Sequence, residues 1–154
     1  MKKLFVSLVG VFLLSVVVFG CDTDKDIAYF LGDWIESGSG DIHIKGSDDS
    51  PYPRYRIPIT VVKVHDEKAM VIRDNTEIDA VLNHDKLNFS SSSISIRFQH
   101  ITADSAKLVG SAMAEDGVVH VNYEIEGIGS TKNDSTVAFL IQMNAVWRRY
   151  SDRD

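Results

Sequence analysis

Apolar and polar residues alternate with a period of two through most of the chain after residue 30, which is the pattern of half-buried β-strands. The alternation is longest near the end, where every second residue from Val137 to Trp147 is apolar. It is also regular between Val119 and Ile125. Helical periodicity is hard to find in this part of the chain. The pattern therefore predicts an all-β fold.

Turn-forming residues divide the alternating segments and set the expected strand ends. Turns are expected at Asp74-Asn75, Asn83 to Lys86, Ser90 to Ser93, Ala103-Asp104, Glu115 to Gly117 and Ser130 to Ser135. The strands are expected at 33–37, 41–45, 55–65, 68–73, 76–82, 86–89, 94–101, 105–114, 118–128 and 135–149, some of them merging across a bulge. Such short connections between consecutive strands predict an antiparallel meander.

A flat meander of this size would leave two edge strands exposed, and closure into a barrel removes both edges. We therefore expect a single antiparallel up-and-down β-barrel of about eight strands, in preference to a two-sheet sandwich. The polar segment from Gly46 to Pro53 contains two prolines and two aspartates and is expected to be a flexible loop.

The first 21 residues differ from the rest of the chain. Two lysines precede an uncharged apolar run that ends at Val18, which is the layout of a secretory signal. Val18, Gly20 and Cys21 resemble the lipobox of bacterial lipoproteins, although Phe19 is bulkier than is usual in that family. This resemblance implies cleavage before Cys21 and lipidation of its thiol. The alternatives are an uncleaved membrane span and an ordinary signal peptide that precedes a cysteine.

The chain is thus expected to have three parts: a signal peptide at 1–20, the lipidated cysteine with a short charged tether at 21–26, and one barrel domain at 27–154. Two or more acyl chains on Cys21 would suffice for stable membrane anchoring. Asp22 resembles the signal that retains enterobacterial lipoproteins in the inner membrane. The expected location is the periplasmic side of the inner membrane, with the outer membrane as the alternative.

The number of cysteines and the net charge argue against disulfides and against a nucleic-acid partner. Cys21 is the only cysteine, so no disulfide is expected and the core must hold the fold. Removal of the signal leaves 14 Lys and Arg residues against 22 Asp and Glu residues, a net charge of −8. Nucleic acid is therefore not expected as a partner, because nothing would neutralise its phosphates.

The residues around Trp34 carry a further resemblance. Gly32-Asp33-Trp34, after a short apolar turn, resembles the Gly-x-Trp opening of lipocalin-like barrels. The resemblance implies that Trp34 closes one end of the barrel and that Arg149, near the end of the last strand, lies across its ring. These roles are structural. The alternative is that Gly32 belongs to an ordinary turn and that Trp34 is an ordinary aromatic residue of the core. Small bacterial barrels without the lipocalin C-terminal helix are the closer comparison.

No catalytic motif is found with its required spacing, so no enzymatic activity and no cofactor are expected. Single histidines are spread along the chain, at positions 43, 65, 84, 100 and 120, and are expected to be solvated. Asp22, Asp24 and Asp26 have the spacing of a calcium loop, but Ile27 occupies the position that needs glycine. No metal site is expected.

Two functions from different classes remain open. One is a barrel that binds a small apolar ligand in its interior, where Ala106, Gly110 and Ala112 leave room either for that ligand or for aromatic side chains from facing strands. The other is an interaction or inhibitor module that binds an envelope protein. Its candidate contact is the region from Gly38 to Pro53, with Asp41, Asp48 and Asp49.

Overall fold

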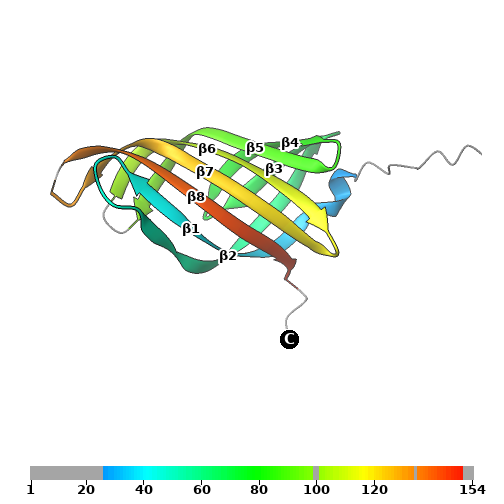
Figure 1. Ribbon diagram of the computed structural model, residues 1–154. Helices are drawn as coiled ribbons and strands as arrows, with labels where there is room; N and C mark the ends of the chain where they lie inside the picture. The colour runs from blue at the N-terminus through cyan, green and yellow to red at the C-terminus, as the bar shows by residue number, and fades with distance from the viewer. Residues whose placement is uncertain (1–25, 99–100, 134, 151–154) are drawn as a thin grey trace, which may run out of the picture.

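The computed structural model describes residues 26–98, 101–133 and 135–150. In these residues eight antiparallel strands follow one another around a closed barrel, preceded by a single 3-10 turn (Figure 1). The elements are η1 (Ile27–Tyr29), β1 (Gly32–Ile44), β2 (Ser50–His65), β3 (Lys68–Arg73), β4 (Thr76–Asn83), β5 (Lys86–Phe98), β6 (Ile101–Glu115), β7 (Val118–Thr131) and β8 (Thr136–Arg149). The predicted all-β up-and-down barrel is confirmed.

Closure depends on the first and last strands. β1 pairs with β8 in one continuous register that runs from Trp34 opposite Arg149 to Ile44 opposite Phe139. Turn η1 and the end of β8 therefore lie at the same end of the barrel (Figure 1). We call this the proximal end, and the opposite end, which carries the β1–β2 and β7–β8 loops, the distal end.

The expected segments at 33–37 and 41–45 form one strand, β1, and those at 86–89 and 94–101 form another, β5. The turns expected at Ser90 to Ser93 and at Ala103-Asp104 are wrong, because both segments lie inside strands. Irregular register occurs at each place, between Ser91 and Ile94 and between Thr102 and Ala106. Serine and alanine that look like turn residues are thus accommodated at bulges, which interrupt the ladder without ending the strand.

The loop expected from Gly46 to Pro53 is too long. β2 begins at Ser50, and Pro51 lies opposite Asp41 in the ladder with β1. Proline lacks the N–H that a second neighbouring strand would need, so it is confined to edges of a ladder. β2 pairs only with β1 in this stretch, because its pairing with β3 begins at Ile59.

The β3–β4 connection shows how local chemistry sets a turn. Asp74 and Asn75 both have positive φ, of 47° and 61°. A two-residue type I′ hairpin requires this conformation at both positions, and Asp and Asn tolerate it better than most residues. The hairpin is short, with only 6 and 8 residues in its strands.

Alternate residues of every strand point into a continuous apolar core. The 3-10 turn adds to this core at the proximal end, since Ile27 is 3% exposed and Phe30 is fully buried. Asp26 caps the turn by accepting a hydrogen bond from the backbone N–H of Ala28 at 3.2 Å. The proximal end is therefore covered by the chain's own N-terminal segment.

Candidate functional site

The structure brings together Gly32, Trp34 and Arg149 at the proximal end. The guanidinium of Arg149 lies 3.8 Å from the centroid of the Trp34 ring. Its Nη1 donates to the carbonyl of Leu31 at 2.6 Å and its Nη2 to that of Tyr29 at 3.3 Å. Gly32 has φ of 109°, and a Cβ there would lie 2.8 Å from Arg149 Nη1. Arg149 thus fastens the covering segment to the last strand, which is a structural role.

The centre of the barrel holds a polar cluster that the sequence analysis did not identify. Glu36 of β1 is fully buried. Its Oε1 accepts hydrogen bonds from Tyr55 Oη at 2.8 Å and Arg73 Nε at 3.2 Å. Its Oε2 accepts from Trp147 Nε1 at 2.6 Å and from the hydroxyl of Tyr123. Four donors from four other strands therefore converge on one carboxylate.

Charge is balanced within this cluster. Arg73 forms an ion pair with Glu36, and its guanidinium lies 5.5 Å and 5.6 Å from the ring centroids of Tyr55 and Tyr123. Burial raises the pKa of the Tyr55 and Tyr123 hydroxyls, and the neighbouring carboxylate of Glu36 raises it further. Both tyrosines therefore stay protonated at neutral pH and act as hydrogen-bond donors to Glu36.

Aromatic rings fill the space around the cluster. Phe89 stacks near Trp147, with ring centroids 6.3 Å apart, and lies 5.2 Å from Tyr123. A Cβ on Gly110 would overlap the ring of Phe89. The small residues of β6 thus make room for aromatic side chains of neighbouring strands, and the central interior is packed rather than hollow.

The wall of the barrel is incomplete at the distal end. The β3–β4 hairpin stops at Arg73 and Thr76, so β2 before Ile59 and β5 after Ser90 have no pairing with it. The stretches 50–58 and 91–98 therefore each pair on one side only. We call the place where these two edges face each other the distal gap.

Side chains, not backbone hydrogen bonds, span the distal gap. Tyr52 of β2 and Phe98 of β5 stack with ring centroids 4.3 Å apart. Six of the seven apolar or aromatic residues that are only partly buried against the core lie toward this end: Ile44, Tyr52, Tyr55, Ile57, Ile96 and Phe98. Among the described residues, the apolar side chains of the distal end are thus only partly buried, whereas η1 and Phe30 cover the core at the proximal end.

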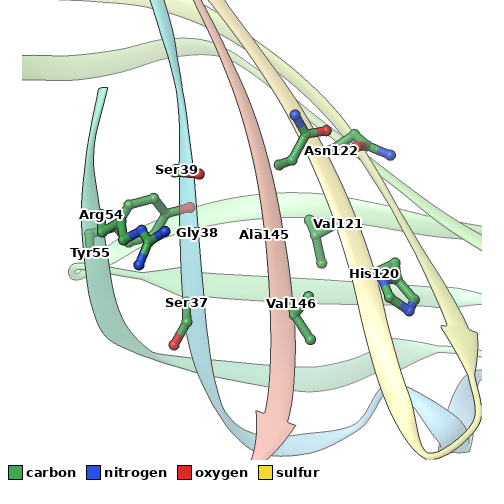
Figure 2. Close-up of a pocket in the computed structure, with 11 residues that line it drawn as sticks. Ser37, Gly38, Ser39, Arg54, Tyr55, His120, Val121, Asn122, Ala145 and Val146 are labelled. Atoms are coloured by element: carbon green, nitrogen blue, oxygen red, sulfur yellow. The ribbon is translucent and has the colours of Figure 1, made fainter. Parts of the chain in front are cut away.

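A hollow lies on the outer wall of the barrel. It is a groove of about 470 Å³ over β2, β1, β8 and β7 (Figure 2). Polar side chains that point outward line much of it, among them Ser37, Ser39, His120, Asn122 and Asn144. Tyr55 also lines the groove, beside Gly38, where a Cβ would lie 2.8 Å from the tyrosine hydroxyl.

The acidic region considered for partner binding divides between two elements. Asp41 is exposed on β1, whereas Asp48 and Asp49 lie in the β1–β2 loop. His43 Nδ1 lies 2.8 Å from an Asp49 carboxylate oxygen, and this hydrogen bond raises the pKa of His43. The loop is therefore attached to β1 rather than free.

Some of the other predicted site residues lie outside the described part of the chain. Cys21 and Asp22 lie there, as does His100, so the structure leaves the lipidation prediction untested. Within residues 26–98, 101–133 and 135–150, no group of three or more His, Cys, Asp or Glu side chains has a geometry suited to a metal ion. Nor does any helix in these ranges have the length and apolarity needed to cross a membrane.

These features define the protein's class as a small closed antiparallel β-barrel with a filled centre. Comparison of the chain with known family models, with curated proteins and with solved structures found no match in any of the three.

Proposed function

We propose that the protein is a lipid-anchored protein of the cell envelope and that its non-enzymatic, lipocalin-like barrel binds a small apolar ligand at the distal gap. The observation that carries this proposal is the collection of partly exposed apolar side chains around a break in the wall. Burial of such surface stabilises a complex by about 25 cal/mol per Å². An apolar ligand therefore gains the most binding free energy where apolar side chains lie close together and are still partly exposed.

The position of the ligand follows from what the interior already holds. The centre is occupied by the Glu36 cluster and by the rings of Phe89 and Trp147, which would have to be displaced. Among the described residues, Tyr52 and Phe98 stack across the distal gap. Rotation of these two rings breaks no backbone hydrogen bond of the ladder, so it is the least costly way for a ligand to enter.

The proposed anchor suits this arrangement. Asp26, which precedes the proximal turn η1, is the last residue of the tether predicted from the sequence. A lipid on Cys21 would hold the proximal end toward the membrane surface. The distal gap would then face away from the membrane, open to ligands in the periplasm.

Ligand binding is tested with residues 22–154, which contain the whole barrel, expressed in the bacterial periplasm. Native mass spectrometry is expected to show a small-molecule adduct that is lost on denaturation, or a fatty acid and an apolar dye are expected to bind on titration. Ile96→Asp puts a charge at the gap and is expected to abolish binding. The matched control is Ile128→Asp, because Ile128 is 68% exposed. An empty wild-type protein that ignores both titrants would contradict the proposal.

A further inference from the structure

One uncharged row of side chains crosses the outer wall. The cross-strand register places Ser39 opposite Asn144, Asn144 opposite Asn122 and Asn122 opposite Ser111. Ser111 in turn lies opposite Asn88. These residues belong to five consecutive strands of the closed wall, β1, β8, β7, β6 and β5. We call the row of Ser39, Asn144, Asn122, Ser111 and Asn88 the amide row; the groove of Figure 2 covers its β1, β8 and β7 members.

The two asparagines at the centre of the row have no partner within the part of the chain that the structure describes. Asn122 and Asn144 lie directly opposite each other and are exposed, yet their side-chain amides make no hydrogen bond to the described residues. The same holds for the hydroxyl of Ser39. By contrast, the pair next along these two strands is bonded, since Gln142 Nε2 donates to Glu124 Oε1 at 2.9 Å.

The choice of asparagine here is not explained by the stability of the sheet. Asn is depleted in β-strands, where β-branched and aromatic residues are preferred. Both residues lie in the middle of strands that are paired on both sides, where this preference applies. Outward amides with donors and acceptors to spare instead favour recognition of a polar ligand.

We infer that the amide row binds a linear, uncharged glycan that lies across the strands on the outer wall of the barrel. Adjacent strands are about 4.8 Å apart. This is close to the length of one sugar unit in an extended chain. Successive side chains of the row would therefore meet successive sugars, and each amide has the donor and acceptor that two neighbouring hydroxyl groups require.

The surroundings of the row favour a neutral glycan over an acidic one. On the distal side, the next row contains the exposed carboxylates Asp41 and Glu124. On the proximal side, the next row runs from Ser37 through Val146, His120 and Met113 to Lys86. Apolar side chains suit the C–H faces of sugars, whereas nearby carboxylates repel an anionic chain. A single cation, Arg54, lines the groove near β1.

This site is separate from the distal gap, so the two proposals stand or fall independently. The amide row points away from the barrel axis, because its residues alternate with buried ones such as Val121, Tyr123 and Met143. A glycan there needs no opening of the barrel.

The test is isothermal titration of residues 22–154, which contain the whole barrel, with N-acetylglucosamine oligomers of two to six units. Affinity is expected to rise with each unit until the row is covered. The double variant Asn122→Val/Asn144→Val is expected to weaken binding by about tenfold or more, since several hydrogen bonds are lost. Valine suits a central strand, so this variant is expected to fold.

The matched control is Asn83→Val, because Asn83 is exposed at the end of β4 and lies outside the row. Its affinity for the oligomers is expected to equal that of the wild type. No binding at millimolar oligomer would overturn the inference, as would equal binding by the double variant or stronger binding of an acidic oligosaccharide. Binding of an apolar dye at the distal gap is expected to be unchanged in the double variant.

Discussion

Glu36 and Arg73 form an ion pair inside the barrel, with Arg73 Nε 3.2 Å from Glu36 Oε1, although β2 lies between their two strands. The pair is nearly dry, since the side chain of Glu36 is fully buried and that of Arg73 is 16% exposed. Loss of one partner from a buried pair leaves an uncompensated charge, which costs more than the pair contributes. The pair therefore makes the barrel sensitive to single substitutions at its centre.

Glu36→Gln is expected to lower the free energy of unfolding by about 3 to 5 kcal/mol, because Arg73 keeps its charge but loses its buried counter-charge, which leaves it with the exposed carboxylate of Asp74 at 3.9 Å. Urea unfolding measures the change. The control is Glu124→Gln on the outer face of β7, where a change within about 0.5 kcal/mol is expected. Equal stability of the two variants would contradict this account of the cluster.

Stability is expected to fall as the pH rises above about 10. Burial and the Glu36 carboxylate raise the pKa of Tyr123 and Tyr55 above their ordinary value of 10.0. The unfolded chain then loses phenolic protons that the folded chain keeps, so the free energy of unfolding decreases with pH in this range and not below it. Urea unfolding at several pH values between about 8 and 11 tests this. A level profile across that range would refute it.

Gly110→Ala is expected to cost about 1 to 3 kcal/mol of stability, because the new methyl group overlaps the ring of Phe89. If that contact is the cause, Phe89→Leu should relieve part of the cost. The double variant is then expected to be more stable than the sum of the two single effects predicts. Thermal unfolding of all four proteins gives the comparison, and strictly additive effects would count against a filled centre at this position.

Arg149→Ala is expected to destabilise the fold by about 2 kcal/mol, through loss of the contact with the Trp34 ring and of the hydrogen bonds to Leu31 and Tyr29. Tryptophan fluorescence is expected to change as the proximal segment loosens. Arg148→Ala is the control, because Arg148 is exposed on the outer face. If both variants unfold alike, Arg149 does not fasten the proximal end.

Much of the fold could be read from local pattern. Period-two alternation identified the strands, and Asp74-Asn75 and Glu115 to Gly117 marked turns at their observed places. The errors fell where local chemistry is ambiguous. Serines at 90 to 93 look like a turn but lie in a bulged strand, and Pro51 and Pro53 look like a loop but lie on a one-sided ladder. Such residues take their conformation from their neighbours in space.

The candidate sites were harder to predict from the sequence than the fold was. Glu36 shares the strand parity of Trp34, so a charged residue in an inward position was a usable indication of a buried cluster. The distal gap arises because β3 and β4 are shorter than their neighbours β2 and β5. The strands expected at 68–73 and 76–82 were already shorter than the one expected at 55–65. The amide row could not be anticipated, because it depends on the register of five strands.

The sequence by itself determined that apolar and polar residues alternate along the chain and that turns are frequent, because side-chain period and turn chemistry are local properties. The tertiary structure alone decided which side chains lie next to one another inside the barrel and on its outer wall. The partners of Glu36 are 19, 37, 87 and 111 residues away along the chain. Closure of β1 on β8 and the strand register set these meetings, and a one-residue slip would send each side chain to the opposite face.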